Sequence, residues 1–180
     1  MPQPAGGQCT SDFGQRILIM GNSGSGKSTL ARQLGERLDL PVMHIDTLNW
    51  QPGWVLNAGR DQAIQDVAEQ PAWVLDGNNS ATRATLLARA DTVIFLDINR
   101  VTCIAGVLKR WAKYYRKTRP DMTEGCPEKI DLPFLGYIWS WPSRKRHIML
   151  ACLAELAPPK QAIHLKGRPA VRRFLRTLSM

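Results

Sequence analysis

One short glycine-rich segment constrains the fold of this chain more than any other feature. Residues 21–28 read G-N-S-G-S-G-K-S, which fits the pattern G-x-x-x-x-G-K-[ST]. An apolar run, Arg16–Met20, precedes the segment and predicts a buried strand, and the leucine spacing of Lys27–Leu38 predicts a helix directly after it. A strand, this loop and a helix in that order are the setting of a phosphate-binding loop (P-loop), so we expect an α/β fold.

The residue types in this loop suit a nucleotide triphosphate. Glycines let backbone N–H groups converge on a phosphate, and the helix N-terminus adds its partial positive charge. Lys27 would contact the β- and γ-phosphates, and the Ser28 hydroxyl would bind Mg²⁺. The alternative is a Gly/Ser-rich turn that merely caps a helix. We predict ATP and Mg²⁺ as cofactors, with ATP bound by Gly21, Asn22, Ser23, Gly24, Ser25, Gly26, Lys27, Ser28 and Thr29.

Strand and helix patterns alternate along the rest of the chain. Further strands are expected at 42–45, 73–75, 92–96 and 162–165, and helices at 59–70, 80–89, 100–117, 136–156 with a break at Pro142, and 169–178. Residues 118–133 hold several prolines and are expected to form a loop. This alternation predicts βαβ units and a parallel sheet within one domain, 15–180. The polar, Gly/Pro-rich residues 1–14 are expected to be a disordered tail.

Three predicted strands are followed by an aspartate: Asp46, Asp76 and Asp97. Ligands of parallel sheets bind beyond the carboxyl ends of the strands, so these side chains are expected near the nucleotide. We predict that Asp76 helps to hold Mg²⁺ or the acceptor, and that Asp46 orients an acceptor hydroxyl. The alternative role for each is a helix cap or a loop acid, and we favour that role for Asp97.

Charge is distributed unevenly along the chain, which carries a formal net charge of +9. Up to Asp97 there are 7 Lys and Arg against 10 Asp and Glu, and after it 17 against 5. A basic half is consistent with nucleic acid, an anionic membrane or a phosphate-bearing substrate, but also with solvated helix faces. The four cysteines are far apart without a C-x-x-C pair, which argues against structural zinc and a disulfide framework. No apolar run reaches the length of a membrane span, so we expect a cytoplasmic protein.

Several segments together resemble one family. Residues 21–29, Asp46–Trp50, Trp73–Asn78 and Phe95–Arg100, with T-R-P-D-M at 118–122 and G-C-P-E at 125–128, are similar to the topology-modulation-protein group of adenylate-kinase-like P-loop proteins. The resemblance covers about residues 16–178, and its most specific part is the T-R-P-D-M and G-C-P-E region. It implies a five-stranded parallel sheet in the order 2-3-1-4-5, an acceptor-binding region at about 46–70 and a lid at about 116–135.

The resemblance also implies roles for individual side chains. Kinases of this type surround the transferred phosphoryl group with arginines, and Arg110 stands where one is expected. One turn earlier those kinases usually carry another arginine, whereas this chain has Gly106. Arg116, Arg119, Arg144 and Arg146 could supply charge from the lid or the following helix. Arg83 loosely resembles an arginine that binds an acceptor phosphate. Trp50 and Trp54 could form a wall of the acceptor pocket, and ordinary burial of both rings is the alternative.

The leading hypothesis is therefore a kinase that transfers the γ-phosphoryl group of ATP to a small acceptor, with Lys27, Arg110, Arg116 and Asp46 as catalytic residues. A rival hypothesis is a nucleic-acid-associated ATPase linked to DNA topology, whose basic half contacts the phosphate backbone. A third is a nucleotide-dependent switch with negligible turnover. The first needs basic side chains that converge on the P-loop, whereas the second needs an outward basic stripe, as on the last helix. The identity of the acceptor and the oligomeric state do not follow from the sequence.

Overall fold

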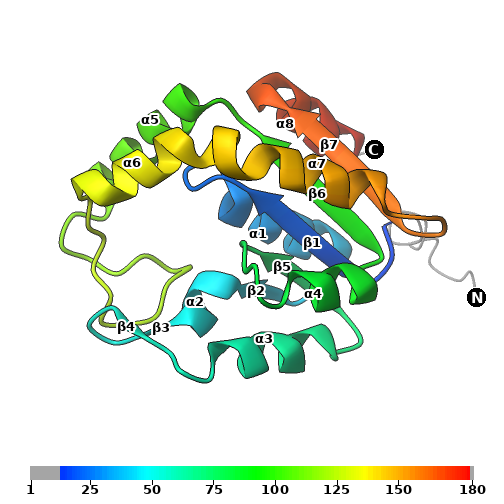
Figure 1. The fold of residues 1–180 in the computed structure, drawn as a ribbon, viewed down its shortest axis with the longest axis horizontal. Helices are drawn as coiled ribbons and strands as arrows, with labels where there is room; N and C mark the ends of the chain where they lie inside the picture. The colour runs from blue at the N-terminus through cyan, green and yellow to red at the C-terminus, as the bar shows by residue number, and fades with distance from the viewer. Residues whose placement is uncertain (1–12, 179–180) are drawn as a thin grey trace, which may run out of the picture.

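Five parallel strands form the centre of the protein, whose computed structural model describes residues 13–178 (Figure 1). They lie in the order β2-β5-β1-β6-β7. Counted along the chain within this sheet, that order is 2-3-1-4-5, so the expected topology is confirmed. The strands are β1 (Arg16–Gly21), β2 (Val42–His44), β5 (Trp73–Asp76), β6 (Thr92–Asp97) and β7 (Gln161–Lys166).

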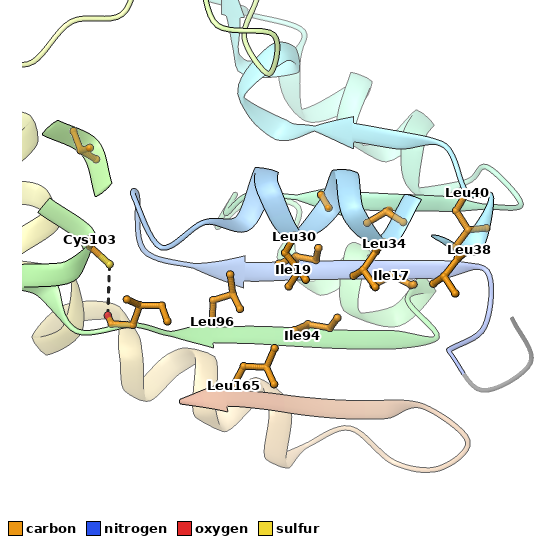
Figure 2. Packing of buried hydrophobic residues seen from close by; sticks show 14 of the residues in the cluster. Ile17, Ile19, Leu30, Leu34, Leu38, Leu40, Ile94, Leu96, Cys103 and Leu165 are labelled. Atoms are coloured by element: carbon orange, nitrogen blue, oxygen red, sulfur yellow. Dashed lines mark hydrogen bonds between the residues drawn. The ribbon is translucent and has the colours of Figure 1, made fainter. Parts of the chain in front are cut away.

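Helices cover both faces of the sheet because successive strand residues point to opposite sides. Ile17 and Ile19 of β1 pack with Leu30 and Leu34 of α1 on one face (Figure 2). Leu18 belongs to the core on the other face, which α3, α4 and α7 cover. The helices that form these layers are α1 (Lys27–Leu38), α3 (Arg60–Ala68), α4 (Arg83–Arg89), α5 (Arg100–Lys113), α6 (Leu132–Trp141), α7 (His147–Ala154) and α8 (Gly167–Thr177).

The segment after β2 differs from the prediction. The strand ends at His44, and Asp46 lies in the first turn of a short helix, α2 (Ile45–Asn49). A two-stranded antiparallel hairpin follows, formed by β3 (Trp50–Gln51) and β4 (Val55–Leu56). Its turn contains Pro52 and Gly53, a dipeptide typical of turns. Asp46 was expected directly after the strand, but it lies two residues beyond the end of β2 and belongs to α2.

Two helix boundaries also differ. The helix expected at 100–117 ends at Lys113, and Arg116 adopts a left-handed backbone with φ 57°. The helix expected from Gly136 begins already at Leu132, because Asp131 caps it by accepting a hydrogen bond from the Phe134 N–H at 2.8 Å. Pro133 is tolerated there because a helix has no backbone partner for the N–H groups of its first turn.

The helix is not broken at Pro142, where the sequence predicts a break, because helical structure continues through this residue. Residues Pro142–Arg146 form a π-helical turn that joins α6 to α7. A wider turn of this kind accommodates a proline that would clash with the carbonyl four residues earlier in a regular helix. One long helical rod thus runs along the sheet (Figure 1).

The predicted tail lies outside the described residues except for Phe13 and Gly14, which belong to the domain. The rings of Phe13 and Phe174 pack edge to face with 5.8 Å between their centres. The backbone carbonyl of Phe13 accepts a hydrogen bond from the Thr92 hydroxyl at 2.6 Å. Cys103, Cys126 and Cys152 are free thiols. Among the described helices, none has both the length and the apolar character needed to cross a bilayer.

Candidate functional site

The glycine-rich segment forms the loop between the end of β1 and the start of α1. Gly24 and Gly26 adopt left-handed backbones, with φ 76° and 98°, which glycine tolerates without steric cost. No side chain caps α1 at Gly26, so the N–H groups of its first turn face the open side of the loop. The Ser25 hydroxyl is buried and has no hydrogen-bond partner within residues 13–178. Such a helix start is suited to a phosphate.

Lys27 is held above this loop. Its ammonium group donates to the Asn22 carbonyl at 3.0 Å. Burial lowers the pKa of Lys27, while the nearby carboxylates of Asp76 and Asp46 act in the opposite direction. A lysine removed from water gains electrostatic stabilisation from an anion placed close to it.

Asp76 lies beside the loop because of the sheet register. β5 pairs with β1 so that Asp76 is opposite Ile19, and β2 pairs with β5 so that His44 is opposite Asp76. The Ser28 hydroxyl donates to one carboxylate oxygen of Asp76 at 2.8 Å, and Nδ1 of His44 contacts the other. Hydroxyl and carboxylate oxygens are ligands that Mg²⁺ prefers, directly or through water. Ser28 and Asp76 therefore fit a magnesium ion that completes its coordination with nucleotide phosphates.

A cleft of about 720 Å³ opens in front of the loop. It extends from the P-loop along α5 to α2, the β3–β4 hairpin, α6 and residues 114–131, which we call the α5–α6 loop. Many of the predicted site residues line it: Ser23, Gly24, Gly26, Lys27, Ser28, Thr29, Asp46, Trp50, Asp76, Arg110 and Arg119. One cavity therefore joins the expected phosphate site to the expected acceptor region.

A cluster of acids and arginines lies in this cleft. Arg119 of the α5–α6 loop is only 5% exposed and contacts Asp46 at 2.7 Å, Glu128 at 3.5 Å and Asp121 at 3.6 Å. Arg110 of α5 contacts Glu128 at 2.7 Å. Burial opposes the charge of Asp121, but the nearby Arg119 guanidinium holds the pKa of Asp121 below the usual value. The T-R-P-D-M and G-C-P-E residues thus meet around Arg119.

The α5–α6 loop is hydrogen-bonded to the β3–β4 hairpin, which lies in the expected acceptor region (Figure 1). The Thr123 hydroxyl lies 2.7 Å from the Trp50 carbonyl, and the Cys126 thiol donates to the Gln51 carbonyl at 3.2 Å. The Gly53 N–H donates to the Gly125 carbonyl at 3.0 Å, and the Trp54 indole N–H to the Pro127 carbonyl at 3.1 Å. These bonds fasten the predicted lid to the hairpin rather than to the P-loop.

Four predicted arginines do not line the cleft, and one of them, Arg146, pairs with Asp97 at 2.8 Å. Arg83 begins α4 and lines a separate small cavity. Arg116 is exposed after the end of α5, with its guanidinium 5.4 Å from the Tyr115 ring centre. Arg144 is exposed on the π-helical turn. Their charges are therefore not part of the cluster around Arg119.

The remaining predicted loop residues support its shape. Asn22 is buried, donates to the Ile138 carbonyl at 2.9 Å and accepts from the Ser23 N–H at 2.8 Å. The Gly21 carbonyl accepts from the Asn78 amide at 2.6 Å. Asp97 lies outside the cleft lining and is bound by Arg146 at 2.8 Å and His164 at 2.9 Å. Asp97 therefore has structural partners, but it is neither a helix cap nor a loop acid: it ends β6, and Asn99 caps α5 by accepting a hydrogen bond from the Thr102 N–H at 2.8 Å.

The structure brings further residues to the cleft that sequence reasoning did not assign to it. Asp121, Tyr137 and Arg168 line it, and the Arg168 guanidinium lies 3.4 Å from the Gly24 carbonyl. Arg168 follows β7, whose carboxyl end shares the edge of the sheet with the P-loop, so strand position alone could have indicated it. Tyr137 carries no such signal, because α6 reaches the cleft only through tertiary packing.

Close packing between α5 and the P-loop explains why position 106 is a glycine. A Cβ atom at this position would lie 2.5 Å from the Gly24 carbonyl oxygen. Any side chain here, including the arginine that the resemblance leads us to expect, would push α5 away from the P-loop. Gly106 thus allows α5 to contact the loop directly, while Arg110, one turn later, reaches the cleft.

Of the comparisons with known proteins, the one with solved structures gives matches. No family model matches the chain, and no curated protein matches it in sequence. Among solved structures, shikimate kinase from Acinetobacter baumannii in complex with shikimate has a TM-score of 0.60 at 13% identity, with 93% of this chain and 92% of that chain covered. A gluconokinase from Sinorhizobium meliloti 1021 has a TM-score of 0.55 at 18% identity, with 93% of both chains covered. A sugar kinase from Janibacter sp. HTCC2649 has a TM-score of 0.51 at 19% identity, with 92% and 93% covered. The chain therefore has the fold of P-loop kinases of the adenylate-kinase-like type.

Proposed function

We propose that this chain binds MgATP at Gly21–Thr29 and transfers the γ-phosphoryl group to a hydroxyl of a small acceptor bound between α2, the β3–β4 hairpin and the α5–α6 loop. The observation that carries the proposal is the single cleft that joins the P-loop to Asp46. The similar solved structures described as shikimate kinase, gluconokinase and sugar kinase support the same reaction class.

The residues of the chain divide the work of such a transfer. MgATP, when bound, supplies the phosphoryl group and a metal that neutralises its charge. The N–H groups in the first turn of α1 and the Lys27 ammonium would hold the phosphates, and Ser28 and Asp76 would hold the metal. Arg110 adds positive charge along the cleft. The Asp46 carboxylate holds the acceptor hydroxyl and accepts its proton as the new ester bond forms.

Asp46 is suited to this role because it remains partly free. Its side chain is 52% exposed in the cleft, and Arg119 contacts only Oδ2. A carboxylate with one oxygen fixed by a buried guanidinium has a defined orientation, and the other oxygen can accept a hydrogen bond. Arg119 is thus a positioning residue for Asp46.

The nucleic-acid hypothesis has one observation in its favour. α8 packs Val171 and Phe174 against the core and leaves Arg172, Arg173 and Arg176 exposed. Five basic residues of α5 and the α5–α6 loop, by contrast, line the cleft that contains the P-loop: Lys109, Arg110, Lys113, Arg119 and Lys129. We therefore favour transfer to a small acceptor over a role in DNA topology.

The proposal is tested by measuring ADP release from MgATP with nucleoside monophosphates, nucleosides, shikimate, gluconate and small alcohols. At least one acceptor is expected to raise ADP release above the rate without acceptor in the wild type. Lys27→Ala is expected to abolish that increase. Lys117→Ala, which changes an exposed side chain outside the cleft lining, is expected to retain it. ADP release that is equal with and without every acceptor would contradict the proposal.

A further inference from the structure

We infer that the acceptor is an uncharged polyhydroxyl compound, such as a sugar or a sugar alcohol, and not a carboxylate or a phosphate ester. This inference rests on the proposed function, because it concerns the acceptor of the same cleft. Three properties of the cleft carry it: its arginines already have acidic partners, it offers exposed carboxylates to hydroxyl groups, and its walls include aromatic rings.

The first property is the pairing of the arginines. Recognition of a carboxylate or a phosphate depends on guanidinium N–H groups that are free to make paired hydrogen bonds. Arg119 is surrounded by three carboxylates, Arg110 is bound to Glu128, and Arg32 lies 4.0 Å from Asp121. An anionic acceptor would have to displace these partners. Asp121 and Glu128, which are 8% and 7% exposed, would then remain buried without a counter-ion.

The second property is the charge that remains open to the acceptor. Asp46 and Asp131 are exposed carboxylates of the cleft lining. The exposed lysines of the same lining, Lys109, Lys113 and Lys129, are in contact with water, which weakens their attraction for an anion, and the Lys129 ammonium lies 4.7 Å from the Trp54 ring centre. Carboxylates repel an acidic acceptor but accept hydrogen bonds from neutral hydroxyl groups.

The third property is the aromatic wall. Trp50 and Trp54 both line the cleft with their rings edge to face, 5.5 Å between centres. The hydrogen bond from the Trp54 indole to Pro127 fixes that ring. Indole faces bury the C–H surface of a sugar ring at a small entropic cost, while hydroxyl groups at the ring edge reach polar partners. Asp46, Asn49 and Tyr137 line the same cleft and offer polar groups to such hydroxyls.

Matched acceptors that share one carbon skeleton test this inference. With MgATP at saturation, kcat/KM is measured for glucose, gluconate and glucose 6-phosphate, and for myo-inositol and inositol monophosphate. We expect the neutral member of at least one set to exceed its anionic partners by about tenfold or more. Turnover of the anions with the neutral compounds inactive would overturn the inference and leave the proposed phosphoryl transfer intact. No turnover with any acceptor, neutral or anionic, would overturn both.

A variant tests the pairing argument separately. Glu128→Gln removes the carboxylate shared by Arg110 and Arg119, so a free guanidinium becomes available to an anion. The preference for neutral over anionic acceptors is expected to fall by about tenfold. Glu124→Gln, on the same loop but exposed, is expected to leave the preference unchanged. A folded Glu128→Gln protein with wild-type preference would contradict the pairing argument. If this variant does not fold, the wild-type comparison of acceptors alone decides the inference.

Discussion

Replacement of Gly106 by alanine is expected to distort the P-loop, because the new methyl group would press from α5 on the loop backbone. Alanine stabilises a helix by about 0.5–1 kcal/mol relative to glycine. At position 106, however, the added Cβ would lie 2.5 Å from the Gly24 carbonyl oxygen, which is backbone and cannot rotate away. Forced overpacking of this kind costs about 1–3 kcal/mol. The net effect expected for Gly106→Ala therefore ranges from neutral to about 2.5 kcal/mol of destabilisation.

Gly136→Ala is the matched control. Gly136 is exposed on α6, and a Cβ there meets nothing within 4 Å, so only the helix-forming gain of about 0.5–1 kcal/mol remains. The free energy of unfolding, measured by urea denaturation, is expected to be lower for Gly106→Ala than for Gly136→Ala by the overpacking cost of about 1–3 kcal/mol. Calorimetry is expected to show weaker MgATP binding only for Gly106→Ala, by about tenfold if 1.4 kcal/mol of the distortion falls on the loop. Equal stability and equal MgATP affinity of the two variants would refute the reasoning.

Three further predictions concern the lid, the interaction of Asp97 with Arg146 and His164, and the basic helix α8. Hydrogen exchange of residues 116–135 is expected to slow when a non-hydrolysable ATP analogue binds, and exchange of the β3–β4 hairpin should slow with it because the two are hydrogen-bonded; equal exchange with and without the analogue would count against a lid. Although burial opposes it, hydrogen bonds from Arg146 and His164 lower the pKa of Asp97, so its stabilisation is present above the pKa of an unfolded aspartate, about 3.9, and is lost as the pH falls through the lower folded value. The urea midpoint should thus fall less steeply below pH 5 in Asp97→Asn than in the wild type, and equal slopes would be the contrary result. Duplex DNA is expected to bind only with a Kd of about 10⁻⁴–10⁻⁶ M at physiological salt; sub-micromolar binding that is lost when Arg172, Arg173 and Arg176 become alanine would revive the nucleic-acid hypothesis.

The parts of the fold that local sequence patterns determine were predictable. The buried strands have apolar runs, and the glycine-rich segment between β1 and α1 has residue types that only a phosphate-binding loop combines in that setting. The position of Asp76 followed from the expectation that its strand neighbours β1, which the sheet register confirms.

Features that depend on tertiary contacts were not predictable. Arg116 and Arg119 are three residues apart in the same basic segment, yet Arg119 is buried among three carboxylates and Arg116 is exposed. The difference arises because α5 ends at Lys113 and the chain turns through a left-handed residue at Arg116. No periodicity indicates such a turn. Likewise, position 106 requires a glycine because the Gly24 carbonyl packs against it, a contact between residues 82 positions apart that no local pattern indicates.

The fate of the γ-phosphate tests the proposed transfer most directly. Phosphorus NMR of a reaction that contains MgATP, the wild-type chain and glucose or myo-inositol follows that phosphate as it leaves ATP. A phosphate-ester signal that grows in step with ADP, and that is absent with Lys27→Ala, is the predicted result. Conversion of ATP to ADP and inorganic phosphate alone, across the neutral and the anionic acceptors, would contradict the transfer and indicate an ATPase.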